Sequence, residues 1–314
     1  MPIVVALAGD TMLGRGVAEH LQSAPPESLV APEVVAAIRE ADLFVLNLEC
    51  CISDRGRPWS RPGKPFFFRA PPEAIGLIRA LDVDCVTLAN NHALDFGPEA
   101  LLDTLALLDE AGIAHVGAGA DLERARCPAV LDAHGLRMAV FGVSDHPDDF
   151  AATSDRPGIA YDELHDGVPD WLVEQIAGFR SNGVAVLVTP HWGPNMTAAP
   201  LPRIRRAAAE LAAAGATLVA GHSAHVFHGV EGPVLFDLGD FLDDYAVDPI
   251  LRNDLGLLFL VTLDEERPIR LEAVPLKLEY CYTRLADGED ARWIRRRFQN
   301  ACADFGTSVA EDGG

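Results

Sequence analysis

The chain has 314 residues, and 49% of them are hydrophobic, which is enough to bury a large core. Its 47 acidic and 25 basic residues give a formal net charge of −22, and so acidic a surface repels nucleic acid and anionic lipid. We therefore exclude nucleic acid and anionic membranes as expected partners, and we expect a globular protein.

The N-terminal segment does not have the pattern of a secretion signal. Its sequence, MPIVVALAGD, contains a short apolar run without a preceding basic region, and the run leads directly into Gly9 and Asp10. No window approaches the roughly 20 apolar residues that a membrane-spanning helix needs. The six cysteines are scattered, without CxxC pairs or the spacing of a disulfide framework. These features predict a cytoplasmic protein.

Short apolar runs alternate with helical patterns over residues 3–220. The expected strands are 3–8, 43–48, 85–89, 129–131, 137–143, 184–189 and 217–220. The expected helices are 32–41, 72–81, 98–111, 171–180 and 204–214. Two segments rich in Pro and Gly, 52–70 and 144–167, are expected to be loops.

The pattern changes after residue 225, where β-type runs follow one another with little helix between them. Strands are expected over 234–237, 256–263 and 269–278, and a closing helix over 291–305. Residues 307–314 are predicted to form a flexible tail. Because the chain has no internal repeat and no linker-like tract, we expect one domain over residues 1–306. Its fold class is α/β, with two packed sheets and helices outside them.

Polar residues follow five of the predicted strands at their C-terminal ends, which is the edge where open α/β sheets bind ligands. The groups are Gly9-Asp10, Asn47-Leu48-Glu49, Asn90-Asn91-His92 with Asp95, His191-Trp192-Gly193, and Gly221-His222-Ser223-Ala224-His225. Taken singly, such a carboxylate usually caps a helix and such a histidine is usually structural. Together, carboxylate oxygens and imidazoles predict a site for a divalent metal: Mn, Fe, Zn or Co. A structural zinc site is disfavoured because no thiolate takes part.

The order GD…NLE…NNHxxDxG…HWG…GHxxH resembles the CapA-like proteins, which are named for poly-γ-glutamate capsule synthesis. They are a family of the calcineurin-like metallophosphoesterase superfamily. The resemblance runs from Gly9 to about Asp240, and the sequence LGDF at 238–241 is close to a signature of the family. It implies a metallophosphoesterase-like fold, a four-layer α/β/β/α sandwich of two mixed sheets with metals between the sheets at the strand ends.

The resemblance also implies roles for single residues. Metal ligands are implied at the positions that match the family's motifs: Asp10, Glu49, Asn91, His191, His222 and His225. Among them, Glu49 takes the place of the bridging carboxylate, and His225 that of the last ligand of a second ion. His92 matches a histidine that acts as general acid or hydrogen-bond donor, and Asp95 is its expected orienting partner.

This chain differs from the wider superfamily at three points. Met12 stands where the first motif usually has a histidine, and a thioether is a poor ligand for a hard or borderline ion. The last motif is HxxH in place of the usual HxH. Asn195 stands where CapA-like chains often have a glutamate. One tightly bound ion, or two ions of which one is weaker, are both compatible with these differences.

Further residues are candidates for contacts with a small-molecule or peptide-like anionic substrate: Arg15, Lys64, Arg69, Asn195 and His228. The loop 55–69 carries a basic patch that either holds a carboxylate or phosphate, or is simply solvated. Arg15 either lines the crevice or pairs with an acidic neighbour. His228 is either a further base or a structural imidazole. The oligomeric state stays open.

Three functions are compatible with these residues. The first is hydrolysis of a phosphoester or of a peptide or polyglutamate-type substrate, by metal-activated water with His92 as general acid. The second is metal-dependent peptide epimerisation, in which histidines transfer the α-proton. The third is a non-catalytic accessory role in the synthesis of a capsule polymer.

Overall fold

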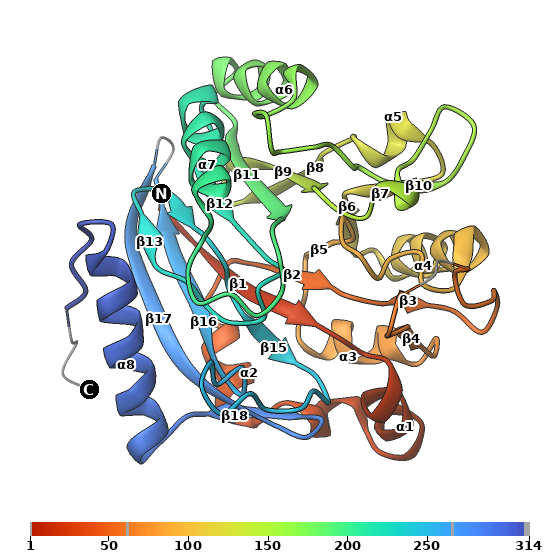
Figure 1. Ribbon diagram of the computed structural model, residues 1–314, viewed down its shortest axis with the longest axis horizontal. Coiled ribbons are helices and arrows are strands. Elements are labelled where there is room, and N and C mark those ends of the chain that lie inside the picture. Colours follow the sequence, from red (N-terminus) through yellow and green to blue (C-terminus); the bar gives the residue numbers. More distant parts are fainter. Residues whose placement is uncertain (1, 61–62, 265–266, 311–314) are drawn as a thin grey trace.

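The computed structural model describes residues 2–60, 63–264 and 267–310, and most of its strands belong to two mixed sheets (Figure 1). The larger sheet has the order β18-β17-β16-β1-β2-β5-β6, with β15 paired to β1. Its strands are β1 (Ile3–Thr11), β2 (Leu43–Leu48), β5 (Cys85–Thr87), β6 (Ala114–Val116), β15 (Asp240–Leu242), β16 (Leu255–Leu263), β17 (Pro268–Glu279) and β18 (Tyr282–Leu285). Strands β1, β2, β5 and β6 are parallel, whereas β16, β17 and β18 continue from β1 in antiparallel pairs.

The second sheet has the order β13-β14-β12-β11-β9-β8. Its strands are β8 (Ala129–Ala133), β9 (Leu136–Ser144), β11 (Ala185–His191), β12 (Leu218–Ala220), β13 (Val230–Glu231) and β14 (Val234–Leu235). The four central strands are parallel, and the two edge strands pair antiparallel to them. Two short pairs lie outside both sheets: β3 (Cys51–Ile52) with β4 (Arg69–Ala70), and β7 (Ala118–Gly119) with β10 (Gly158–Ile159).

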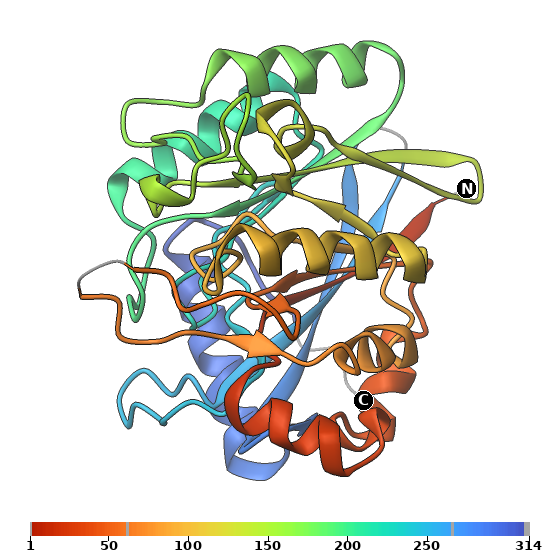
Figure 2. The same cartoon turned by 90° about the vertical axis from the view of Figure 1, so that its right-hand side faces the viewer.

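The helices divide into groups that pack on different sheets. They are α1 (Arg15–Ser23), α2 (Pro32–Ile38), α3 (Ala74–Ala80), α4 (Gly97–Ala111), α5 (Leu122–Ala125), α6 (Asp170–Ser181), α7 (Pro202–Ala214) and α8 (Gly288–Ala303), with 3-10 turns at Pro26–Leu29 and Asp148–Phe150. Figure 2 shows α6 in green at one end of the molecule, α1 in red at the other, and α4 between them. Helix α8 lies beside β17 (Figure 1).

Strand β1 shows why the larger sheet contributes to two separate cores. Successive side chains of a strand point to opposite faces of its sheet. Ala6 and Ala8 therefore join a hydrophobic cluster with residues of α1, α2, α3 and α4. Ile3, Val5 and Leu7 join a second cluster, which also contains side chains from β9, β11 and β12 of the other sheet. One core is thus shared by the two sheets.

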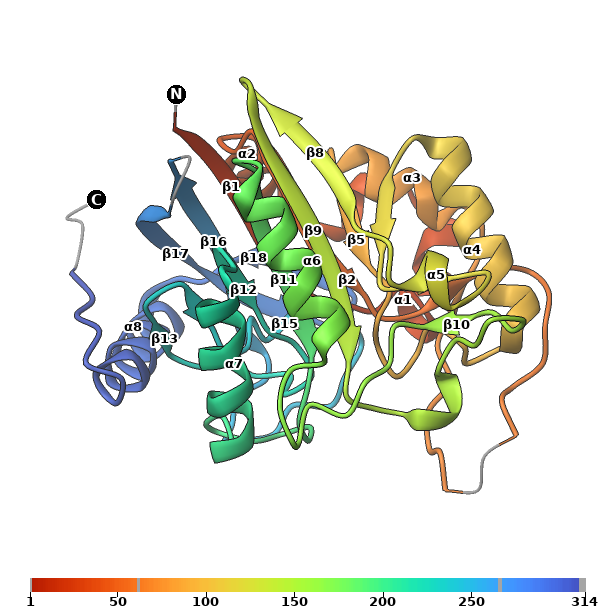
Figure 3. The same cartoon turned by 90° about the horizontal axis from the view of Figure 1, so that it is seen from above.

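Strand β11 has the same alternation in the second sheet. Ala185 and Leu187 belong to the core shared with the larger sheet. Val186 and Val188 belong to a third cluster, which contains side chains of α6 and α7. Figure 3 shows α6 and α7 next to β9, β11 and β12, with α3 and α4 beyond β5. Both faces of the parallel strands are buried, which explains their nearly continuous apolar runs.

The carboxyl ends of the parallel strands hold polar residues in register with one another. Asp10 of β1 lies opposite Asn47 of β2 and opposite Asp240 of β15. In the second sheet, an isolated bridge joins His191, at the end of β11, to His222, just beyond β12. The strand pairing therefore aligns motifs that are far apart in the sequence.

Gly9 allows this edge of the sheet to close tightly. A Cβ atom at Gly9 would lie 1.8 Å from the carbonyl oxygen of Gly239, so no other residue fits without moving the backbone. The backbone N–H of Asp10 donates to that same carbonyl oxygen over 2.9 Å. The register of β1 against β2 shifts between Ala8 and Asp10. The glycine thus brings the segment before β15 into contact with β1.

The expected strands and helices are confirmed, with differences at their ends. Strand β11 extends to His191, two residues beyond the expected end, and α8 begins and ends earlier than the predicted helix. Helix α1 was not expected, and β14 is only two residues long. The two predicted loops contain the short strands β4 and β10. Two-residue strands are too short to show a period in the sequence, because tertiary pairing forms them.

Near the C-terminus, Val309 packs against the core that the sheets share. The rest of the predicted tail, 311–314, lies outside the described residues. Within the described ranges, no helix combines the length and the apolar character needed to cross a membrane.

Candidate metal centre

Asp10 is the meeting point of three of the sequence motifs. Its side chain is buried, and its Oδ1 atom accepts a hydrogen bond from Asn47 Nδ2 over 2.7 Å. His222 Nδ1 lies 3.4 Å from the same oxygen, and His225 Nδ1 lies 3.2 Å from Oδ2. The end of β1, the end of β2 and the HxxH segment after β12 therefore converge on one carboxylate.

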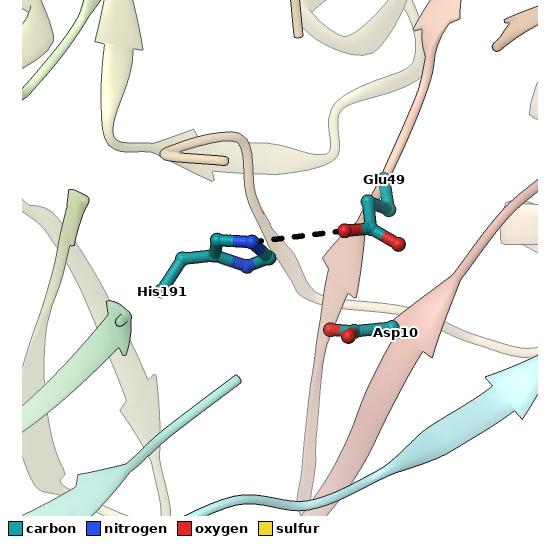
Figure 4. Close-up of side chains that lie close together, drawn as sticks. All are labelled: Asp10, Glu49 and His191. Carbon is teal, nitrogen blue, oxygen red and sulfur yellow. Dashed lines mark ion pairs between the residues drawn. The ribbon is translucent and has the colours of Figure 1, made fainter. Parts of the chain in front are cut away.

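Glu49 and His191 complete a first group of potential ligands with Asp10 (Figure 4). The three side chains are buried and point toward one another, and one ligand atom from each lies within 4.8 Å of the others. His191 Nε2 is 3.7 Å from Glu49 Oε1. Three side chains predicted as ligands thus share one space between the two sheets' strand ends.

A second group consists of Asp10, His225 and Asp240, again with ligand atoms within 4.8 Å of one another. His225 Nδ1 donates to Asp240 Oδ1 over 2.8 Å. Asp10 belongs to both groups. Asp240 was not predicted as a ligand, although it is the acidic residue of the LGDF sequence that supported the family resemblance. The LGDF sequence therefore contained the residue, but nothing in the sequence indicated that β15 pairs with β1 and brings Asp240 to Asp10.

The candidate ligands have buried polar atoms without hydrogen-bond partners among the described residues. These atoms are Asp10 Oδ2, Glu49 Oε1, Asn91 Oδ1, His191 Nε2, His222 Nδ1 and Asp240 Oδ2. Buried polar atoms in proteins are nearly always hydrogen bonded, so a group of unsatisfied ones needs an explanation. Oxygen atoms and imidazole nitrogens are the donors that borderline divalent ions prefer. The residues present therefore fit a divalent metal.

The pKa values of the carboxyl groups lead to the same interpretation. Burial, followed by the charge of Asp10, raises the pKa of Glu49 well above its usual value, and burial raises the pKa of Asp240 to about 6. Burial also opposes ionisation of Asp10, but the nearby imidazoles of His222 and His225 hold its pKa well below the usual value. So many acids in one buried space repel one another unless a cation is present.

The pKa values of His191 and His225 are shifted in opposite directions. Burial lowers the pKa of His191 well below its usual value, so its imidazole is neutral and offers a lone pair. Burial acts in the same direction on His225, but the charges of Asp240 and Glu49 outweigh it and raise the pKa of His225. A protonated His225 stands in for part of the positive charge that a metal ion would bring.

His92 is held by the carboxylate that was expected to orient it. Its Nδ1 atom lies 2.6 Å from Asp95 Oδ2, and the ring of Phe68 stacks on the imidazole with ring centres 4.0 Å apart. Asp95 is fully buried and also accepts the backbone N–H of Phe68 over 2.6 Å. Burial lowers the pKa of His92, and Asp95 offsets this only partly. The bond to Asp95 leaves Nε2 available for a substrate.

A cavity of about 340 Å³ is lined by His92 and several other predicted residues. Its lining residues are Gly63, Lys64, Pro65, Phe66, Asn91, His92, His146, Pro147, Phe150 and Asn195. Sequence reasoning missed His146, whose ring centre lies 5.1 Å from that of His191 and whose Nδ1 atom bonds to Asp145. It follows β9 in the sequence Ser-Asp-His, the same kind of strand-end group that indicated the other residues.

Lys64 and Asn195 lie at this cavity, but both already have partners. Lys64 Nζ is 2.8 Å from Asp95 Oδ1 and donates to the Asn91 carbonyl oxygen over 2.8 Å. Asn195 Nδ2 lies 3.2 Å from His225 Nε2. Lys64 therefore supports the His92 pair, and a direct substrate contact from it stays a prediction.

The remaining predicted substrate residues have other contacts. Arg15 pairs with Asp244, its Nε donating to Oδ1 over 3.0 Å, which is the second of the two expected alternatives. The guanidinium of Arg69 lies 4.2 Å from the ring centre of Phe96. His228 Nε2 donates to the Thr197 carbonyl oxygen over 2.8 Å. The basic patch of the loop 55–69 also includes Arg61, which lies outside the described residues.

Met12 has a structural contact at the position where the superfamily usually has a histidine. Its side chain is fully buried in the cluster beneath α1, and its sulfur accepts the backbone N–H of Gly14 over 3.0 Å. Met12 is therefore engaged in packing, and the candidate ligand from β1 is Asp10.

Comparison with known proteins gives one family match and several relatives. Residues 4–245 match the family described as "Bacterial capsule synthesis protein PGA_cap". A Mycobacterium tuberculosis H37Rv protein named "Probable polyglutamine synthesis accessory protein Rv0574c" is 32% identical, over 98% of this chain and 93% of the relative. "Capsule biosynthesis protein CapA" of Bacillus anthracis is 26% identical, over 88% of this chain and 68% of the relative.

Likeness to solved structures is weaker. A crystal structure of the protein TT1561 of Thermus thermophilus is 12% identical, covers 84% of this chain and 100% of its own, and has a TM-score of 0.40. A likeness at this level identifies no function.

Proposed function

The chain belongs to the bacterial capsule synthesis protein family PGA_cap, and from this premise we propose that it is a metal-dependent hydrolase acting on a phosphoester or a peptide or polyglutamate-type substrate. The observation that carries the proposal is the group of buried, unsatisfied carboxylate and imidazole atoms around Asp10. We further propose that the two sheets and their outer helices form the α/β/β/α sandwich of the metallophosphoesterase superfamily.

The metal would be held by the two groups that share Asp10, together with Asn91 and His222. When bound, a divalent ion supplies Lewis-acid polarisation of a carbonyl or phosphoryl oxygen and makes water acidic enough to attack near neutral pH. One ion or two, of Mn, Fe, Zn or Co, are compatible with these donors.

His92 is the residue of this chain that would transfer a proton to the leaving group. Asp95 accepts from Nδ1, so the other ring nitrogen is the one that can exchange a proton with a substrate in the cavity. Phe68 and Lys64 hold the pair from two sides. The cavity of about 340 Å³ lies at the lower end of the range of small-molecule sites, so it can take the reacting unit of a substrate beside His92.

Peptide epimerisation is a second candidate, and one observation favours it. His146 lines the same cavity as His92, and it too has a carboxylate partner, Asp145. Two imidazoles backed by carboxylates can remove and return a proton without breaking the chain. A third candidate, an accessory role in polymer synthesis without catalysis, is supported by the name of the Mycobacterium tuberculosis relative.

Metal analysis and two assays separate these functions. The purified protein is expected to contain a divalent metal by inductively coupled plasma mass spectrometry, and to lose it in the Asp10→Ala variant. Hydrolysis of bis-p-nitrophenyl phosphate or of a γ-glutamyl oligomer supports the first function. Deuterium uptake from D₂O into an uncleaved peptide supports the second. Metal-free protein with no binding of added Mn²⁺ would overturn both enzymatic proposals.

A further inference from the structure

Tyr245 reaches Glu49 from the segment that follows β15. Its hydroxyl donates to Glu49 Oε2 over 3.3 Å, and its backbone N–H donates to Asp243 Oδ1 over 2.7 Å. The side chain is partly buried and packs against the core beneath the helices. Among the described residues, Tyr245 is the hydrogen-bond partner of Glu49 Oε2.

The two oxygen atoms of Glu49 have different surroundings. Oε1 has no hydrogen-bond partner among the described residues and lies 3.7 Å from His191 Nε2, within the first group of potential ligands. Oε2 accepts from the Tyr245 hydroxyl. Because one oxygen is engaged by the tyrosine, rotation of the carboxylate is restricted and the other oxygen stays directed at His191.

The ring of Tyr245 is itself held on several sides. Its centre lies 5.8 Å from that of Phe68 and 5.4 Å from that of His225, which meets it edge-on. The guanidinium carbon of Arg15 lies 5.5 Å from the ring centre. Arg15 also pairs with Asp244, so the start of α1 is tied to the residue before the tyrosine. The hydroxyl therefore comes from a rigidly packed side chain.

We propose that Tyr245 is a positioning residue that directs Glu49 Oε1 into the metal centre, an inference that rests on the proposed role of Glu49 as a ligand. Hydrogen-bond partners of ligating carboxylates fix the ligand's orientation, and their loss typically weakens metal binding by about 10–100-fold. Tyr245 also contacts His225 of the second group, so one side chain restrains ligands of both groups.

The test compares two variants that each lose one tyrosine hydroxyl. Tyr161 is the matched control, because its hydroxyl donates to Glu163 Oε1 over 3.5 Å, outside the candidate ligands. Binding of Mn²⁺ to metal-free protein is measured by isothermal titration calorimetry. Tyr245→Phe is expected to weaken binding about tenfold, with Tyr161→Phe unchanged. Thermal unfolding in EDTA checks that both variants fold.

A double-mutant cycle identifies the residue through which Tyr245 acts. In a Glu49→Ala background, with the more tightly held Zn²⁺ used for all four proteins of the cycle, Tyr245→Phe should cause no further loss of affinity. Repeated full loss in that background would overturn the inference, as would equal Mn²⁺ affinity of Tyr245→Phe and the unmodified protein. If the unmodified protein binds no metal, the proposed function fails instead, so the two failures are distinguishable.

Discussion

Asp10 and Asp240 lie opposite each other in the parallel pair formed by β1 and β15, and both contact the same nitrogen of His225. Two carboxylates directed at one imidazole are stable only while that imidazole is charged or a cation is present. From this relationship we expect the stability of the protein to depend on metal, which can be measured.

Removal of the Asp240 charge is expected to have opposite effects with and without metal. Burial raises the pKa of Asp240 to about 6, so near pH 7.5 its ionisation in the metal-free fold opposes folding. Asp240→Asn should therefore be at least as stable as the unmodified protein in EDTA, but gain less from added Mn²⁺. Thermal unfolding in both buffers checks this. Glu231→Gln, an exposed substitution, is the control and should respond to metal normally.

Replacement of His92 should separate chemistry from metal binding. His92→Gln is expected to retain the metal content of the unmodified protein while lowering turnover by about 10²–10⁴-fold, the usual contribution of a general acid. The check is metal analysis alongside kcat on whichever substrate is turned over. Parallel measurement of His191→Gln should show loss of metal. Equal loss of metal in both variants would mean that His92 is a ligand.

Asp95 is expected to matter for stability as well as for turnover. It is fully buried and accepts from His92, Lys64 and the Phe68 backbone, so Asp95→Asn leaves the Lys64 ammonium without its carboxylate. Breaking a buried pair on one side typically costs about 3–5 kcal/mol. Urea unfolding of Asp95→Asn and of the double variant Asp95→Asn/Lys64→Met measures this loss in the free energy of unfolding. The double variant should recover part of the loss, and a single-variant cost below about 1 kcal/mol contradicts the assignment.

His228 predicts a specific pH dependence. Burial lowers its pKa from 6.5 to about 4, so the folded imidazole stays neutral where the unfolded one becomes protonated. The unfolded state binds more protons between these values, so the free energy of unfolding falls as pH decreases through this window and is unaffected above it.

The measurement compares the unmodified protein with His228→Gln by urea unfolding in EDTA at pH 7.5 and pH 5. Relative to the variant, the unmodified protein should lose about 2 kcal/mol between the two pH values. A difference between the two proteins that does not change with pH would show that His228 is accessible to protons in the fold.

The strand-end motifs were predictable because residue type and position in the chain carry the information. Asp10, Glu49, His191 and His222 each follow an apolar run, and parallel strands bring such ends to one edge of a sheet. The pairing of His92 with Asp95 was equally accessible, since Asp95 lies three positions after His92 in one loop. These inferences needed only local pattern and a general rule of sheet architecture.

Other contacts depend on pairings for which the sequence has no local signal. Tyr245 meets Glu49, and Asp244 meets Arg15, only because β15 pairs with β1, although the two strands lie far apart in the chain.

By itself, the sequence determined which side chains are available for chemistry, the βα order that places them at strand ends, and the family. Only the tertiary structure decided that Asp10 joins both ligand groups, that Asp240 completes one of them, and that Arg15 is engaged by Asp244. The physical reason is that a periodic apolar pattern specifies which face of an element is buried. It does not specify which distant element covers that face, and side-chain partners are set by that second choice.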